Sequence, residues 1–295
     1  MRIVIVGGVA GGMSAATRLR RLLEDAEITV YERSGHVSFA NCGLPYHVGG
    51  VIEERSALLL QTPQSLGARF GLDVRVGHEV VGVDRDRHVL RVRDLASGRE
   101  EERGYDVLVL SPGAVPVRPP VPGIERALVL RDIEDTDAVV AAVEGARSAV
   151  VVGGGYVGLE VAEQLVHRGL QVSLVEAAPQ VMAPLDPEMV EPVHTLMRER
   201  GLDLRLGTTV TEVGERTVTL DDGTELPADV VLAAARASVL SGRAAASSST
   251  STSAPPTRTS TPWGTPWRSA TPSTGPPRSS RWPTRPISRA GSSPT

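Results

Sequence analysis

Val150-Val151-Val152-Gly153-Gly154-Gly155-Tyr156-Val157-Gly158 is the stretch of sequence that decides the fold. Three β-branched residues enter a complete G-x-G-x-x-G turn, and a helical pattern follows. A second apolar run, Val172 to Val175, then ends at Glu176. Strand, glycine turn, helix, strand and an acid about 20 residues after the turn form the dinucleotide-binding signature. We therefore expect a nucleotide-binding βαβ unit, with a βαβ unit that binds nothing as the alternative.

A less complete copy of this pattern opens the chain. The run Ile3 to Val6 enters Gly7-Gly8-Val9-Ala10-Gly11-Gly12, a helical pattern continues to about Leu23, and a strand from Ile28 to Tyr31 ends at Glu32. Val9 occupies the place of the second glycine, so this turn alone is weak evidence. In both copies the N–H groups at the helix N-terminus favour a pyrophosphate, and the acid accepts from a ribose hydroxyl.

The residues after Glu176 indicate which pyridine nucleotide binds. Ala177 and Ala178 follow it, and no arginine does. A carboxylate at this position accepts from a free 2′-hydroxyl and repels a 2′-phosphate. NADH is therefore favoured, and NADPH stays open. The residues expected to bind it are Gly153, Gly155, Gly158 and Glu176.

Alternating apolar and polar residues predict a β-meander in each copy. Residues 70–110 alternate from Leu72-Asp73-Val74-Arg75-Val76 to a strand at Tyr105–Leu110, and the pattern recurs from Leu204 to Leu220. Two glycine turns, each with a meander and a return strand, imply an internal duplication. We expect an α/β fold of two Rossmann-like domains, residues 1–115 and 116–235, one inserted in the other.

Length and composition fit about two globular domains. The chain has 295 residues, 41% of them hydrophobic, and no apolar run reaches the roughly 18–20 residues of a membrane span. Met1 to Ala16 could be mistaken for a signal peptide, but a cleavage pattern is missing. Cys42 is the single cysteine, which excludes an internal disulfide. These features favour a cytoplasmic protein without a membrane partner.

The chain changes character at about residue 235. Through residue 229 it holds 23 arginines and 35 acids, whereas from Val230 onward it holds the other eight of its 31 arginines and no acid. Such a Ser/Thr/Pro/Arg-rich tail is typical of disorder and of affinity for polyanions. A shifted reading frame explains it better. When each codon starts at the third base, Pro262-Trp263-Gly264 is compatible with Val-Gly, and the glycine is required because tryptophan has one codon.

Longer stretches of the tail decode in the same shifted frame. Arg236–Leu240 is compatible with GVRP, Ser249–Arg268 with DEHLRTSDPDIYAVGDAVE, and Arg278–Gly291 with VVPLADPANQQGR. Three matches in one frame and in order indicate a frameshift near Ala234–Arg236, whether genuine or introduced by sequencing. We therefore expect residues 236–295 to be a non-native, disordered tail.

Cys42 lies in the run Ser38-Phe39-Ala40-Asn41-Cys42-Gly43-Leu44-Pro45-Tyr46, between the two glycine turns. A lone cysteine elsewhere is usually an inert core residue. In this context it suggests a thiol that exchanges electrons with a flavin and acts as the thiolate. His36 and His47 are its neighbours in sequence, and we expect both to be structural.

With these motifs, about residues 1–235 resemble the pyridine nucleotide–disulfide oxidoreductases, and within them the single-cysteine branch of coenzyme A-disulfide reductases and NADH oxidases. The motifs are the Gly7 turn, the Cys42 run, Ser111-Pro112-Gly113-Ala114 and the Gly153 turn. GVRP and TSDPDIYAVGDA of the shifted frame resemble the family's closing flavin motif. The resemblance implies an enzyme in which electrons pass from NADH to FAD and then to Cys42. The FAD contacts it implies are Gly7, Gly8, Gly11, Gly12, Glu32, Arg33, Val80, Ser111, Pro112, Gly113 and Arg131.

The surroundings of Cys42 indicate the electron acceptor. Two-cysteine relatives use a C-x₄-C pair, which Cys42 lacks, so its oxidised form is a mixed disulfide with a small thiol or a sulfenic acid. Peroxidase and many oxidase relatives carry a histidine where Val9-Ala10 stands. The resemblance therefore favours reduction of coenzyme A disulfide or a related persulfide or polysulfide. The coenzyme A contacts it implies are Ser14, Arg18, Arg21, Ser38 and Asn41, with a solvated helix face as the other interpretation of the arginines.

Three other functions stay open: an NADH oxidase that reduces oxygen, an inactive remnant, and a nucleic-acid binder with a basic tail. We expect neither a nucleic-acid partner nor a metal site. The family's full-length members are expected to be homodimers in which a tyrosine of the partner subunit protonates the departing thiol. The written frame does not encode that dimerisation domain or the closing flavin motif. We therefore expect the written chain to bind FAD poorly and to turn over little.

Overall fold

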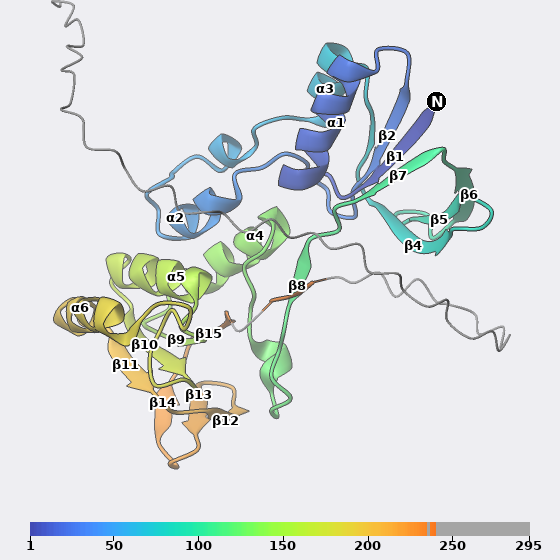
Figure 1. The fold of residues 1–295 in the computed structure, drawn as a ribbon. Coiled ribbons are helices and arrows are strands. Elements are labelled where there is room, and N and C mark those ends of the chain that lie inside the picture. Colours follow the sequence, from blue (N-terminus) through green and yellow to red (C-terminus); the bar gives the residue numbers. More distant parts are fainter. Residues whose placement is uncertain (235–236, 240–295) are drawn as a thin grey trace, which may run out of the picture. The chain divides into compact units, whose positions relative to one another are not determined.

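The described chain contains two parallel four-stranded sheets of the same construction (Figure 1). The computed structural model describes residues 1–234 and 237–239. The first sheet has strand order β3-β2-β1-β7 and the second β11-β10-β9-β15, so the opening strand of each copy lies inside its sheet. The strands of the first sheet are β1 (Arg2–Val6), β2 (Glu27–Tyr31), β3 (Asp73–Arg75) and β7 (Val107–Leu110). Those of the second are β9 (Ser148–Val152), β10 (Gln171–Glu176), β11 (Asp203–Leu206) and β15 (Val230–Ala233).

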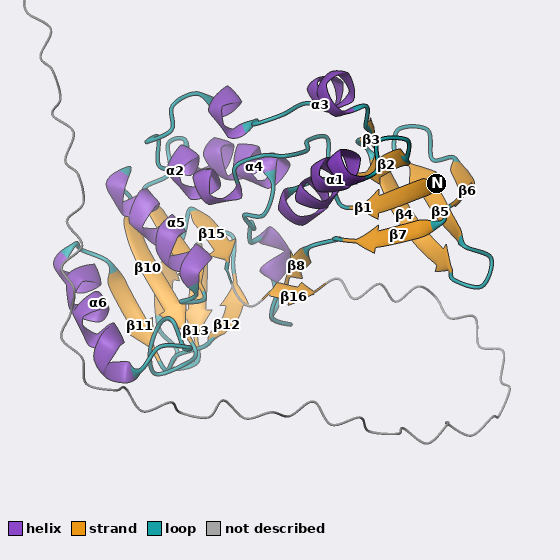
Figure 2. Ribbon diagram, turned by 45° about the horizontal axis from the view of Figure 1, so that its top comes forward, coloured by secondary structure: helices purple, strands orange, loops and turns teal. Residues whose placement is uncertain are grey.

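Helices connect the strands of both sheets in the same order, which confirms the predicted pair of Rossmann-like units. The helices α1 (Ala10–Leu22), α3 (Pro63–Phe70), α5 (Tyr156–His167) and α6 (Pro187–Glu199) precede β2, β3, β10 and β11. Local sequence sets the bounds of α3, because Thr62 and Ser65 form a capping box and Gly71 ends the helix in the left-handed conformation. Figure 2 shows α5 beside β10 and α6 beside β11.

A three-stranded antiparallel meander accompanies each sheet. The first consists of β4 (His78–Asp84), β5 (Val89–Asp94) and β6 (Glu100–Gly104), and the second of β12 (Val210–Val213), β13 (Thr217–Leu220) and β14 (Glu225–Pro227). The meander prediction was wrong at its first strand in both copies. There β3 and β11 pair in parallel with β2 and β10. A short alternating run does not distinguish the edge strand of a parallel sheet from a meander strand.

Two neighbouring strands connect the first nucleotide-binding unit with the second. The strand β8 (Ala114–Pro116) follows the first sheet and pairs antiparallel with β16 (Ala237–Val239), which follows the second sheet. The chain therefore leaves the first unit along β8 and comes back along β16 beside it, as expected for one domain inserted in another. Within the tail predicted to be disordered, residues 236–295, the structure describes Ala237–Val239 as the strand β16. The rest of that prediction lies outside the described residues. Within the described ranges, no helix is long and apolar enough to cross a membrane.

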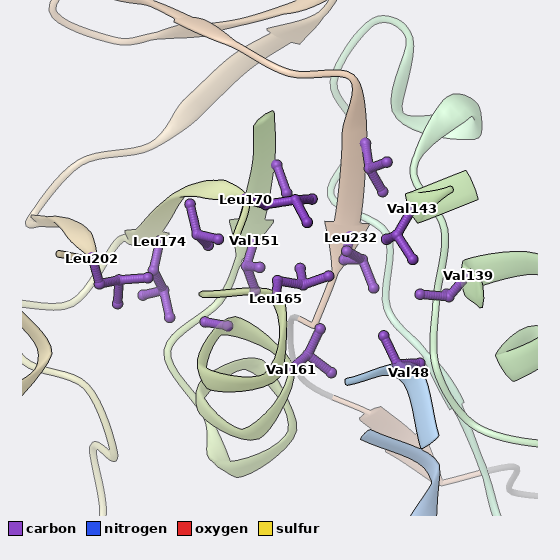
Figure 3. Close-up of a cluster of buried hydrophobic side chains, with 14 of the residues drawn as sticks. Val48, Val139, Val143, Val151, Val161, Leu165, Leu170, Leu174, Leu202 and Leu232 are labelled. Atoms are coloured by element: carbon purple, nitrogen blue, oxygen red, sulfur yellow. The ribbon is translucent and has the colours of Figure 1, made fainter. Parts of the chain in front are cut away.

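Helix α2 (Leu44–Val48) packs into the core of the second unit, although it belongs to the first by sequence. Val48 is fully buried among Val139 and Val143 of α4 (Ile133–Val143) and Val161 and Leu165 of α5 (Figure 3). The short turns η1 (Asn41–Gly43) and η2 (Arg55–Leu58) flank α2, and η3 (Ile124–Arg126) precedes α4. The segment that carries Cys42 is therefore anchored in the second unit.

Truncating Val48 tests this anchoring. Val48→Ala removes two methyl groups from a residue that is 0% exposed, so we expect the free energy of unfolding to fall by about 2 kcal/mol. Val51→Ala, at a position that is 57% exposed, is the matched control and should change it by less than about 0.5 kcal/mol. Urea unfolding followed by circular dichroism measures both. Equal effects at the two positions would contradict the burial of α2.

Candidate functional site

The first glycine turn joins β1 to α1, and its shape requires glycine. Gly7 has a φ of +100°, and a Cβ on it would overlap the carbonyl group of Ser111. A Cβ on Gly12 would overlap the carbonyl oxygen of Gly7. The turn therefore packs directly against the residue that follows β7, at the carboxyl edge of the first sheet.

The second turn is built in the same way, and one of its glycines has free space where a Cβ would lie. Gly153 has a φ of +112°, and a Cβ on Gly158 would overlap its carbonyl oxygen. Gly155 differs, because nothing lies within 4 Å of the place its Cβ would take. The packing of the protein does not need glycine there, whereas a pyrophosphate approaching the backbone does. This open backbone at the start of α5 fits a bound dinucleotide.

A carboxylate fixes each turn from the end of the next strand. Glu32 accepts from the backbone N of Gly8 at 2.6 Å, and Glu176 accepts from that of Gly154 at 2.6 Å. The other oxygen of each carboxylate accepts from the backbone two residues further on, at 2.9 and 2.8 Å. Every carboxylate oxygen has a second acceptor position. Both acids can therefore still accept from a ribose hydroxyl.

Both turns line one cleft of about 1590 Å³, which also contains Cys42 and Asn41. A typical small-molecule site has about 300–1,000 Å³, so this cleft has room for more than one cofactor-sized ligand. Most residues predicted to bind cofactor line it. They are Gly7, Gly11, Glu32, Arg33, Val80, Ser111, Pro112, Gly113, Arg131, Gly153, Gly155 and Glu176.

Seven of the residues predicted to bind a cofactor or coenzyme A do not line this cleft. Gly8, Gly12 and Gly158 are buried behind their turns, and Ser38 is half-buried. Ser14, Arg18 and Arg21 follow one another on an exposed face of α1. Arg20 has a structural role instead, because it donates to the carbonyl oxygens of Phe70 at 2.8 Å and Gly71 at 3.1 Å.

Cys42 is exposed on the 3-10 turn η1. Its segment is tied to the first turn, because the backbone N of Ser38 donates to the carbonyl oxygen of Gly8 at 2.9 Å. Ser38 has a φ of +48°, which is uncommon outside glycine. Of the nearby histidines, His47 places Nδ1 2.7 Å from the carbonyl oxygen of Ile52. The thiol therefore shares its cleft with both turns.

The acidic partner of Arg131 was not among the predicted site residues. Asp132 accepts from Nε of Arg131 at 3.1 Å, and it caps α4 by accepting from the backbone N of Asp135 at 2.9 Å. Burial and then the charge of Asp132 raise the pKa of the Asp135 carboxyl. An acid directly before a helical pattern is a capping signal, and that signal locates Asp132.

Two nucleotide turns and a thiol in one cleft define the chain as a nucleotide-dependent redox protein. Residues 1–243 match the family described as pyridine nucleotide-disulphide oxidoreductase. The chain belongs to this family of oxidoreductases, whose cofactors are FAD and NAD(P)H. The resemblance seen in the sequence is thereby confirmed at the level of the family.

Known relatives include reductases and an oxidase. The curated coenzyme A disulfide reductase of Staphylococcus epidermidis is 35% identical over 224 residues, which cover 75% of this chain and 51% of that protein. The structure of reduced CoADR-RHD from Bacillus anthracis has a TM-score of 0.80 and 43% identity over 83% of this chain and 45% of that one. The water-forming NADH oxidase of Lactobacillus brevis, bound to NADH, has a TM-score of 0.76 and 28% identity over 80% and 54%. The chain spans about half the length of the curated relatives it matches.

Substitutions at two glycines of the second turn should distinguish an effect on nucleotide binding from an effect on folding. Gly155→Ala adds a methyl group in open space, so we expect the thermal midpoint to move by less than about 2 °C while the affinity for NADH falls at least about tenfold. Gly158→Ala should instead lower the free energy of unfolding by about 1–3 kcal/mol, because its Cβ would overlap Gly153. Thermal unfolding and calorimetric titration with NADH measure the two effects. Unchanged NADH affinity in Gly155→Ala contradicts the assignment.

Proposed function

We propose that this protein passes electrons from NADH through FAD to Cys42, which reduces coenzyme A disulfide or a related persulfide or polysulfide. One observation carries the proposal: Cys42 lines the same cleft as both nucleotide turns. The cysteine is exposed, so a disulfide from solution can reach it. The similarity to coenzyme A disulfide reductases supports this substrate class.

In this proposal FAD binds at the first turn. Its pyrophosphate meets the backbone between Gly7 and Gly12, and its ribose meets Glu32. The remaining contacts come from four places that line the cleft. They are Arg33 after β2, Val80 of the meander strand β4, Ser111, Pro112 and Gly113 after β7, and Arg131 before α4. The flavin, when bound, takes a hydride from NADH and delivers two electrons to sulfur.

NADH binds at the second turn. The pyrophosphate approaches the open backbone at Gly155, and Glu176 accepts from the ribose. Ala177 and Ala178 follow Glu176 and line the cleft with it. Neither side chain offers a positive charge to a 2′-phosphate, which supports NADH over NADPH.

Cys42 performs the disulfide exchange. Its thiolate attacks one sulfur of the disulfide, the bond between the two substrate sulfurs breaks, and one thiolate leaves and takes up a proton. The product is a mixed disulfide on Cys42. Two electrons that originate from NADH then cleave it, which restores the Cys42 thiolate and releases the second thiol after protonation. The net reaction consumes one NADH, one proton and one disulfide, and yields NAD⁺ and two thiols.

The proposed coenzyme A contacts come from the Cys42 segment and from α1. Asn41 lines the cleft beside Cys42, whereas Ser14, Arg18 and Arg21 present charge and hydroxyl groups along α1. Arginine at a solvent-exposed helix face suits a phosphate of the coenzyme. Ser38 connects the two regions, because its backbone is hydrogen-bonded to Gly8.

Cys42→Ser distinguishes the proposed reductase from an oxidase and from an inactive remnant. We expect a chain with the reading frame restored after Ala234 to retain flavin, which NADH bleaches, and to release coenzyme A from its disulfide. In Cys42→Ser, bleaching by NADH should persist while release of coenzyme A falls at least about 10³-fold, because the nucleophile is lost. Anaerobic absorbance and thiol release measure these steps. The written chain is the comparison and should hold less flavin.

Two outcomes would contradict the proposal. Oxygen consumption with no release of coenzyme A identifies an oxidase. A frame-restored chain that holds no flavin identifies a remnant.

Exchanging the charge at Glu176 tests the choice of nucleotide. Glu176→Ala combined with Ala177→Arg replaces a carboxylate by a guanidinium, so we expect the ratio of NADPH affinity to NADH affinity to rise at least about tenfold. Calorimetric titration of the second unit within the whole chain measures both affinities. Ala178→Ser is the control, since it adds no charge. A ratio that stays constant would show that Glu176 does not face the ribose.

A further inference from the structure

Helix α5 extends from the second nucleotide turn to the segment that carries Cys42. It begins directly after Gly155 and ends at His167, and Arg168 follows as its cap residue. We propose that Arg168 and Gln164, at the end of α5, are positioning residues for Cys42. The inference rests on the proposed role of Cys42 as the reacting thiol. Neither residue lines the cleft, so both act through α2.

Apolar packing provides the first contact between α5 and α2. Val48 ends α2 and is 0% exposed, in the same cluster as Val161 and Leu165 of α5. Cys42 lies immediately before α2, on η1. A displacement of α2 along α5 therefore moves the sulfur directly.

A hydrogen bond from Arg168 fixes the end of α2. Its Nη1 donates to the carbonyl oxygen of Val48 at 2.9 Å. The last carbonyl groups of a helix have no intrahelical donor, and α2 is a helix of only five residues. The guanidinium supplies one of these missing donors from the neighbouring element. Arg168 is itself exposed, so its effect on the core is small.

Gln164 lies against Gly49, the residue that follows α2. A Cβ on Gly49 would overlap Oε1 of Gln164. Gln164 is 5% exposed, and among the described residues its Oε1 has no hydrogen-bond partner. A buried amide oxygen without a partner costs stability. The position of the Gln164 side chain is therefore better explained by its close contact with Gly49 than by a contribution to the stability of the fold.

Polar contacts with α4 hold the rest of the Cys42 segment. Arg55 of η2 donates to both carboxylate oxygens of Asp137 at 2.7 and 2.8 Å. Glu134 accepts from the backbone N of Gly35 at 2.8 Å. With these contacts, the segment from Gly35 to Arg55 is attached to α4 and α5 on both sides of Cys42. Misplacement of a reacting atom by about 1 Å can cost 10²-fold in rate, so this attachment matters for the thiol.

Arg168→Ala tests the proposal without requiring flavin or turnover. Removing the hydrogen bond to Val48 should raise amide hydrogen exchange in residues 44–50 about fivefold, because the segment opens more often. The rate at which iodoacetamide alkylates the exposed Cys42 should change at least about threefold, because the thiol then leaves its fixed surroundings. Arg168→Lys keeps one donor and should return the alkylation rate to within about twofold of the unmodified chain. Arg198→Ala, at the exposed end of α6, is the matched control and should leave both rates unchanged.

A double substitution at the other contact gives an independent measurement. Gly49→Ala should change the alkylation rate of Cys42, and adding Gln164→Ala should reverse part of that change, because the overlapping Oε1 is then gone while Cβ of residue 164 remains. An alkylation rate in Arg168→Ala within about twofold of the unmodified chain overturns the proposal. So does an increase in exchange spread evenly over β9, β10 and α5, which indicates general destabilisation. A chain that fails as a reductase but shows these local effects refutes the proposed function, whereas the attachment of the Cys42 segment through Arg168 stands.

Discussion

Each nucleotide turn depends on one hydrogen bond from its backbone to a carboxylate, Gly8 to Glu32 and Gly154 to Glu176, both at 2.6 Å. A glycine of positive φ turns the chain out of the first strand, and the carboxylate comes from the end of the parallel neighbour. This contact fixes the turn at the carboxyl edge of its sheet, where open α/β sheets bind ligands. The cleft, and with it the position of Cys42 relative to the turns, follows from this arrangement.

These turns were predictable because their determinants are local. The glycine spacing, the apolar strands and the acids occur within about 30 residues of sequence, which is the length of a βαβ unit. The edge strands β3 and β11 were not predictable, because a run of three or four residues does not reveal its pairing partner. Val48 and Arg168 form a hydrogen bond between distant parts of the sequence, and no local pattern indicates it. Asp132 carried a usable capping signal.

The Cys42 segment connects the two nucleotide units in a way that the sequence order conceals. It follows the first turn along the chain and is hydrogen-bonded to it through Ser38, yet α2 is buried in the core of the second unit. Any movement of the second unit therefore reaches the thiol through α2. This dual attachment is the reason that a single cysteine, without a second cysteine beside it, has a defined place in the cleft that both glycine turns line.

The central claim is that Cys42 carries a mixed disulfide that NADH reduces through FAD. Mass spectrometry of the flavin-loaded, frame-restored chain tests it after treatment with coenzyme A disulfide and again after anaerobic addition of NADH. The account predicts one coenzyme A adduct per chain, on the peptide that contains Cys42, and its loss with release of one equivalent of thiol when NADH is added. An adduct that persists with NADH, or a Cys42 peptide that never acquires one, would contradict the account.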